Sequence, residues 1–373
     1  MGTTLKAAQT STGEYSDAWT FTDSGRVASR THSDTSAGSD PVSFTYTYGD
    51  TARPDAVTGL VPSTGEASSY TYTSSGQRAT TTTGAETSTT AWDVTGRPTS
   101  LTTPSGVMSY WYGADGLFAT TSATAGSVVF AGATQLSVKD GVVSGRRSYT
   151  LGGATTGFRD TAVNASVVSP AANDVQGSAT IQTDPAALSA AAGWVKHTYT
   201  PYGSALASTG GLAWSGINGW LNKPALPGAG LSQVGARQYD PVLQQFTSPD
   251  PLIDPSQPGG FNPYTYAGNN PTTYSDPSGL STLGIGAALG IIPPPLPTPI
   301  SNVGSTWYRG SRSSIGNVSG TADVGAAPSF WGQVGGFASG FASEAFDMVV
   351  ALAPAVLCGA GNLQACYELG AGG

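Results

Sequence analysis

The chain has 373 residues, of which only 10% are charged, and its net charge is −8. A body that binds nucleic acid needs a basic surface, and no block of lysine or arginine is present, so composition excludes DNA or RNA as a partner of the main body. The 51 glycines and 25 prolines interrupt the chain too often for long helices, and the abundant threonine and tyrosine favour strands. Composition therefore predicts a mainly β protein with many short turns.

An aromatic residue followed four positions later by glycine recurs through the first two hundred residues. The pairs are Phe21/Gly25, Tyr72/Gly76, Trp92/Gly96, Tyr112/Gly116 and Tyr199/Gly203. The middle three are spaced by 20 residues, and a fixed period is typical of repeat architectures. That length suffices for two short strands and two turns, with glycine supplying the positive φ of a turn. We expect the aromatic ring of each unit to stack on the next unit.

These units resemble the Tyr-Asp (YD) repeats of RHS, teneurin and insecticidal-toxin proteins. Trp92-Asp93 keeps the aromatic–Asp pair, whereas Tyr72-Thr73 and Tyr112-Gly113 have lost the aspartate. The resemblance implies that residues 1–210 form an antiparallel YD-repeat β-sheet shell, part of a cocoon-like barrel. The repeats are too few to close a chamber, so we expect a distal fragment of a larger shell with open strand edges.

Residues 235–280 carry the most informative motif of the chain. Gly235-Ala-Arg-Gln-Tyr-Asp-Pro241 is followed by Asp250-Pro251 and by Asp276-Pro-Ser-Gly-Leu280. Asp-Pro pairs form turns, because Asp accepts backbone hydrogen bonds and Pro fixes φ, and spacing alone favours turns with no other role. Arg237 ahead of Asp250, and Leu280 just past the second carboxylate turn, favour a reactive site instead.

Two carboxylates within hydrogen-bond reach share a proton, because both cannot ionise easily. The ionised one can take a proton from water while the neutral one donates a proton to a carbonyl, which is the chemistry of aspartic peptide hydrolysis. A neighbouring arginine would hold one carboxylate charged. A scissile bond in the same chain removes the entropic cost of binding a substrate.

This motif resembles the C-terminal RHS-repeat-associated core of polymorphic toxins and of the C component of insecticidal toxin complexes. The resemblance implies a single-turnover intramolecular aspartyl autoprotease without cofactor or metal. Asp250 and Asp276 would be the acid/base pair, Arg237 the orienting cation, and Leu280–Ser281 the cut bond. Leu252–Pro258 is inserted in the loop, which leaves open whether Asp254 rather than Asp250 faces Asp276.

The tyrosines and asparagines between the two carboxylates are expected to be structural. Tyr264 and Tyr266 stand at alternate positions, which predicts one face of a strand. Together with Asn269 and Asn270 they are expected to build the plug formed by residues 211–280.

Five prolines between Pro293 and Pro299 predict a stiff spacer, so residues 281–300 are interpreted as a linker. Residues 301–373 are then a variable C-terminal segment, partly helical at about 336–353. Cys358 and Cys366 lack a metal-site pattern and are interpreted as core-like residues or a local disulfide. The segment has no histidine or lysine, which argues against a complete toxic enzyme. A pre-toxin connector and a small membrane-perturbing peptide both fit its composition, and the connector is preferred.

The family resemblance implies a toxin-encapsulating shell fragment that cuts itself after Leu280 and releases its C-terminal segment, in interbacterial competition or toxin delivery. Its partners would be that segment as cargo, further shell or delivery components, and an immunity protein. The start shows no signal peptide and no apolar run is long enough to span a bilayer, yet the family implies a secreted or cell-surface protein. Two alternatives remain: a non-catalytic structural or adhesive YD-repeat protein, and a carbohydrate-binding β surface. Cleavage that depends on Asp250 and Asp276 would distinguish the self-cleaving shell from both alternatives.

Overall fold

The chain divides into two compact units, Met1–Pro294 and Pro295–Gly373. The computed structural model describes residues 5–6, 15–34, 40–113, 116–123, 126–151, 154–161, 164–187, 193–206, 208–214, 216–226, 228–252 and 262–284, all in the first unit. The predicted proline spacer, the helix at 336–353 and both cysteines lie outside the described residues. The borders at 210, 280 and 300 remain predictions.

The regular structure of the described residues consists of antiparallel β strands and two short 3-10 helices, which confirms the predicted mainly β fold class. A sheet of 19 strands is formed by pairing each strand with its neighbours in sequence. The strands are β1 (Leu5–Lys6), β2 (Tyr15–Phe21), β3 (Val27–Asp34), β4 (Val42–Thr47), β5 (Gly59–Pro62), β6 (Ser68–Tyr72), β7 (Arg78–Thr83), β8 (Glu86–Trp92), β9 (Pro98–Thr103), β10 (Gly106–Gly113), β11 (Gly116–Ser122), β12 (Gly126–Ala131), β13 (Thr134–Lys139), β14 (Val142–Leu151), β15 (Ala154–Asp160), β16 (Asn164–Asn173), β17 (Ala179–Thr183), β18 (Trp194–Lys196) and β19 (Thr209–Gly210). Among the described strands β1 and β19 do not pair with each other, so this large sheet is not closed.

The repeat turns with Asp or Thr after the aromatic residue share one design, in which that side chain closes the turn. Between β8 and β9, Asp93 Oδ1 accepts hydrogen bonds from the backbone N–H groups of Thr95 and Arg97 at 2.8 and 2.9 Å. Where the aspartate is lost, a threonine hydroxyl takes its place: Thr73 Oγ1 accepts from the N–H of Gln77 at 3.2 Å. The repeat therefore tolerates Thr for Asp, because either oxygen can accept the same bond.

The contacts between units differ from the predicted ring stacking. Trp92 Nε1 reaches back and donates to the carbonyl of Arg78 at 3.0 Å, a hydrogen bond to the preceding hairpin. The stacking comes instead from the arginine after the glycine. Arg26 lies 4.7 Å from the ring centre of Tyr48, and Arg97 lies 5.5 Å from that of Tyr112. Such cation–π contacts join consecutive units.

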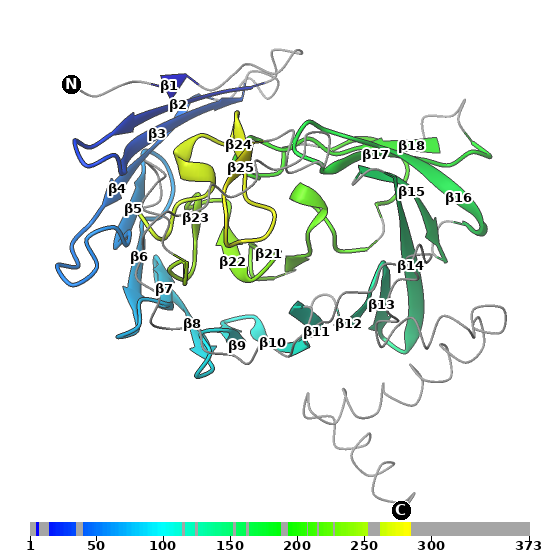
Figure 1. Ribbon diagram of the computed structural model, residues 1–373, viewed down its shortest axis with the longest axis horizontal. Helices are drawn as coiled ribbons and strands as arrows, with labels where there is room; N and C mark the ends of the chain where they lie inside the picture. Colours follow the sequence, from blue (N-terminus) through cyan, green and yellow to red (C-terminus); the bar gives the residue numbers. More distant parts are fainter. Residues whose placement is uncertain are drawn as a thin grey trace, which may run out of the picture. The chain divides into compact units, whose positions relative to one another are not determined.

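A smaller sheet and two short 3-10 helices form a plug against the large sheet. Its strands are β20 (Ala225–Leu226), β21 (Leu231–Val234), β22 (Arg237–Asp240) and β23 (Gln245–Phe246), with a separate pair β24 (Tyr274–Ser275) and β25 (Leu283–Gly284), and the helices are η2 (Trp220–Asn222) and η3 (Ala267–Asn269). In Figure 1 the blue-to-green strands of the large sheet follow one another around β21, β22 and β23. One hydrophobic core joins plug and sheet, since Trp220, Tyr239 and Tyr266 pack in the same cluster as Trp19 and Tyr70.

The predicted plug tyrosines are buried, but not on a strand. Tyr264 is 3% exposed and Tyr266 is fully buried. Thr265, the residue between them, forms only an isolated β-bridge with Gln245, and neither tyrosine belongs to a strand. The predicted strand is therefore wrong. Asn269 ends η3 and donates to the carbonyl of Gly25 at 3.3 Å, while the side chain of Asn270 accepts from the hydroxyl of Thr272 at 2.9 Å.

Substitution of Gly203 by alanine tests the contact between a repeat turn and the plug. Its φ is +85°, and an added Cβ would lie 2.5 Å from the indole of Trp220. Gly25 has nearly the same φ of +78° and nothing within 4 Å of an added Cβ. Both alanine variants should lose about 1–2 kcal/mol through left-handed backbone strain. Gly203→Ala should lose about 1–3 kcal/mol more through overpacking, and urea unfolding of both variants measures the difference. Equal losses would mean that Trp220 does not press on this turn.

Candidate functional site

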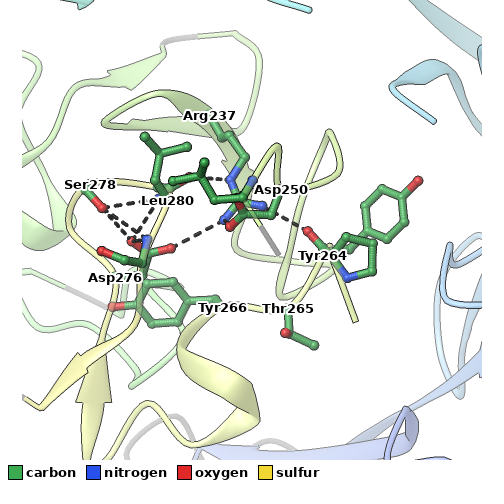
Figure 2. Close-up of polar contacts among 12 residues, drawn as sticks. Arg237, Asp250, Tyr264, Thr265, Tyr266, Asp276, Ser278 and Leu280 are labelled. Atoms are coloured by element: carbon green, nitrogen blue, oxygen red, sulfur yellow. Dashed lines mark hydrogen bonds and ion pairs between the residues drawn. The ribbon is translucent and has the colours of Figure 1, made fainter. Parts of the chain in front are cut away.

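Arg237 joins the two predicted carboxylates. It is the first residue of β22, and its side chain is 3% exposed. Nη2 lies 2.8 Å from Asp250 Oδ2 and 3.4 Å from Asp276 Oδ2 (Figure 2). Three residues that are far apart in the sequence therefore meet at one buried nitrogen atom.

Further contacts hold the guanidinium of Arg237 in position. Nη1 donates to the carbonyl of Pro263 at 2.9 Å, and Nε donates to the carbonyl of Gly279. The guanidinium carbon lies 3.6 Å from the ring centre of Phe246, in cation–π geometry. The position of this side chain is thus determined from several sides.

Asp276 lies against the predicted scissile bond. Its Oδ1 accepts hydrogen bonds from the backbone N–H groups of Leu280 and Ser281, both at 3.1 Å, and from the hydroxyl of Ser278 at 3.0 Å (Figure 2). The nitrogen of Ser281 belongs to the Leu280–Ser281 peptide bond. Asp276 is 2% exposed, whereas Leu280 is half-buried and Ser281 is exposed.

Asp250 occupies a less enclosed position, with its side chain 17% exposed. Its Oδ1 accepts from the N–H of Leu252 at 2.8 Å, and its own N–H donates to the carbonyl of Pro263 at 2.9 Å. Burial raises the pKa of Asp250, the Leu252 N–H and Arg237 oppose the rise, and the charge of Asp276 adds to it. Asp254 lies outside the described residues, so its predicted alternative role remains open.

Arg237 is the cation that contacts both carboxylates, and Lys223, which was not predicted, is coupled electrostatically to Asp276 alone. Burial lowers the pKa of Arg237, and the charges of Asp250 and Asp276 oppose that change. Burial also lowers the pKa of Lys223, where the charge of Asp276 again opposes. Lys223 was missed because it stands in the aperiodic stretch before the motif, where no spacing links it to a carboxylate.

Two glycines let the Asp276 turn approach the turn between β21 and β22. Gly279 has a φ of +67°, and an added Cβ would lie 2.2 Å from the carbonyl oxygen of Val234. Gly235 has a φ of +55°, and its Cβ would lie 2.0 Å from the carbonyl oxygen of Ser278. The N–H of Ala236 donates to that same Ser278 oxygen at 2.9 Å. Backbone therefore packs on backbone where the turn 276–281, which contains the predicted scissile bond, meets residues 234–237; we call this contact the seam. The glycines close to Arg237 and Leu280 in the sequence were the available signal for it.

Within the described ranges, no group of three or more His, Cys, Asp or Glu side chains could hold a metal ion. In the same part of the chain, no helix is long and apolar enough to cross a membrane.

The comparisons with known proteins give structural likenesses alone. No family model and no curated protein matches the chain. Solved structures that are similar include TcdB2-TccC3-Cdc42, at 14% identity over 74% of this chain and 16% of that chain with a TM-score of 0.49. TcdB2-TccC3 matches at 15% identity over 71% of this chain and 16% of that one with a TM-score of 0.48. The Tc holotoxin pore of Photorhabdus luminescens matches at 15% identity over 71% and 15%, with a TM-score of 0.47.

The chain spans only 15–16% of the length of these matched chains. Their sequence identity and scores are too low to carry an assignment of family or activity. The class of the protein rests on its own fold and site: an open antiparallel β sheet that packs on a plug containing an arginine–dicarboxylate cluster.

The raised pKa of Asp250 has a consequence for stability. Because burial favours its protonated form in the fold, its contribution is fully present below the unfolded pKa and is lost as pH rises through the folded pKa. Asp250→Asn should therefore gain stability relative to the parent as pH rises above about 4, the unfolded pKa. Denaturant midpoints measure this, in an Asp276→Asn background intended to keep both chains whole.

Asp50 provides a control of opposite sign. Its hydrogen bond with Arg53 lowers its pKa, so its contribution is present above the unfolded pKa and is lost as pH falls. Asp50→Asn should therefore lose stability relative to the parent as pH rises toward about 4, below the range in which Asp250→Asn gains. The same sign for both variants would contradict the assignment for Asp250.

Proposed function

We propose that the chain is part of an RHS-type toxin-encapsulating shell whose core cuts its own backbone after Leu280 and releases the C-terminal segment. One observation carries this proposal. Arg237 Nη2 contacts Asp250 and Asp276 at 2.8 and 3.4 Å, while Asp276 accepts a hydrogen bond from Ser281, the nitrogen of the bond to be cut.

The proposed reaction is hydrolysis of the Leu280–Ser281 bond by water. We assign Asp250 and Asp276 as the acid/base pair, in which the ionised carboxylate takes a proton from the attacking water. The protonated member of the pair delivers a proton to the leaving nitrogen of Ser281. Water oxygen becomes part of the new carboxylate of Leu280, and the C–N bond breaks to give a new amino terminus at Ser281.

Arg237 supports both roles through its charge. A cation between two carboxylates lowers the cost of bringing them together and favours one ionised member. The site acts once, because cutting the Leu280–Ser281 bond divides the chain that carries it into two pieces. Delivery of the released segment as a toxin, together with secretion and an immunity partner, rests on the sequence resemblance.

A structural role is the second candidate, and one observation favours it. Every acceptor bond of Asp276 Oδ1 is made to its own turn, between Ser278 and Ser281. Asp93 makes the same kind of bonds in a repeat turn with no proposed chemistry. On this alternative the protein is a non-catalytic structural or adhesive shell.

The mass of the purified chain separates the two candidates. The wild-type protein is measured beside Asp250→Asn and Asp276→Asn, with Asp93→Asn as a control that alters a similar turn far from the seam in sequence. Self-cleavage predicts two pieces split after Leu280 in the wild type and in Asp93→Asn, and whole chains in the other two. A single full-length mass in all four proteins would leave the structural role.

A further inference from the structure

We propose that the repeat hairpin β6–β7 is a positioning element for the seam, so that the chain can be cut only after this part of the sheet has docked on the plug. This inference rests on the proposed function and adds a control step to it. Three contacts carry it, made by Arg78, by its backbone N–H and by Gly76. Two of the contacts end on the segments that supply Arg237 and Asp250, and the third ends beside Pro263, whose carbonyl binds both residues.

The first contact is a buried ion pair between sheet and plug. Arg78 Nη1 lies 2.6 Å from Asp240 Oδ2, and the two side chains are 6% and 12% exposed. Asp240 is the last residue of β22, the strand that begins with Arg237. Its other oxygen, Oδ1, accepts from the N–H groups of Val242 and Leu243, both at 2.9 Å. Arg78 therefore anchors the far end of the short strand that carries Arg237.

The second contact joins the same residue to the segment before Asp250. The backbone N–H of Arg78 donates to the carbonyl of Thr247 at 2.8 Å. Thr247 in turn donates its N–H to the carbonyl of Gln238 in β22 at 2.9 Å. Asp250 follows Thr247 by three positions. The start of β7 therefore fixes the position of the segment that carries the Asp250 carboxylate to Arg237.

The third contact comes from the turn between β6 and β7. The hydroxyl of Tyr264 donates to the carbonyl of Gly76 at 2.8 Å in a buried hydrogen bond. The preceding residue, Pro263, provides the carbonyl that accepts from both Arg237 Nη1 and the N–H of Asp250, each at 2.9 Å. A cavity of about 310 Å³ borders this contact, lined in part by Pro249, Pro263 and Tyr264.

Asp276 is held differently. Its turn packs on residues 234–236 through Gly235, Gly279 and the bond from Ala236 to Ser278. The hairpin β6–β7 therefore acts on Arg237 and Asp250 and leaves the Asp276 turn to the plug itself. Since Arg78 and Asp240 are separated by 162 positions in the chain, the complete site requires the sheet to have folded against the plug.

The test compares two tyrosine variants that each lose one hydroxyl. Tyr264→Phe removes the bond to Gly76, while Tyr48→Phe removes a bond of the same kind to Val27 at 2.9 Å within the sheet. Cleavage of freshly refolded chains is followed by mass, and Tyr264→Phe should cut about tenfold more slowly, as loss of one buried hydrogen bond allows. Tyr48→Phe should cut at the wild-type rate.

A second variant tests the ion pair without leaving a buried charge alone. Arg78→Met/Asp240→Asn should cut at least as slowly as Tyr264→Phe. Its pH profile should also change, because water entering beside Asp250 would move the limb governed by that carboxylate to lower pH. Wild-type rates and pH profiles in folded samples of both variants would overturn the proposal.

Hydrogen exchange of backbone amides tests the docking of the hairpin independently of cleavage. If the wild-type chain is never cut, the proposed function fails, and exchange of backbone amides then decides the docking. Faster exchange in residues 247–252 than in 278–281 of Arg78→Met/Asp240→Asn, relative to wild type, supports the positioning role of the hairpin. Unchanged exchange in both segments overturns it.

Discussion

Arg237→Met is expected to abolish cleavage and to lower the free energy of unfolding by about 3–5 kcal/mol, because it leaves charged partners buried without their cation. Both effects follow from one nitrogen atom that contacts Asp250 and Asp276 at 2.8 and 3.4 Å. Arg237→Lys keeps the charge but loses the fork that also binds the carbonyls of Pro263 and Gly279, so it should retain only partial activity. Fragment mass and urea unfolding measure the two effects.

Arg146 provides a matched control for this variant. It is also buried, lies 3.8 Å from Asp160, and its guanidinium carbon lies 3.6 Å from the ring centre of Phe158. Arg146→Met should therefore lose stability to a similar degree and still be cut wherever the chain is folded. Cleavage of Arg237→Met at the wild-type rate would remove Arg237 from the site.

Gly279→Ala is expected to stop or strongly slow cleavage by forcing the Asp276 turn away from the β21–β22 turn. Its φ is +67°, and the added Cβ would lie 2.2 Å from the carbonyl oxygen of Val234, which is backbone and can yield only if the turn shifts. The same shift would carry the Gly279 carbonyl away from Arg237 Nε. A displacement of about 1 Å at a reacting group can cost about a hundredfold in rate.

Gly230→Ala separates this effect from backbone strain. Gly230 has a φ of +64°, yet an added Cβ there would meet nothing within 4 Å. Gly230→Ala should lose about 1–2 kcal/mol of stability and be cut normally. Equal cleavage of the two alanine variants would mean that close backbone packing at Gly279 does not matter for the seam.

The sequence was informative where one short segment supplies both the residue and its partner. Each Asp or Thr that closes a repeat turn accepts a hydrogen bond from the N–H four positions later. Local spacing was therefore enough to predict the turns. The meeting of Arg237, Asp250 and Asp276 was predicted through a family resemblance, and the structure brings all three together.

The contacts between sheet and plug could not be predicted in this way. Trp19 Nε1 donates to Gln244 Oε1 at 2.8 Å across 225 positions, and no periodicity in the sequence connects those two residues. The expected strand through Tyr264 and Tyr266 was wrong for a related reason. Alternate burial arises there from two separate anchors, the hydrogen bond of Tyr264 to Gly76 and the packing of Tyr266 in the core. Alternation by itself does not distinguish these anchors from a strand.

The most direct test of the central claim is the mass of the amino-terminal fragment formed in heavy-oxygen water. The chain is unfolded, diluted into that solvent and allowed to refold, and its fragments are weighed. The proposed hydrolysis predicts a fragment that ends at Leu280 and carries one heavy oxygen atom in its new carboxylate. A chain that stays whole, a fragment that ends elsewhere, or a fragment without the heavy oxygen would contradict self-cleavage by water at this seam.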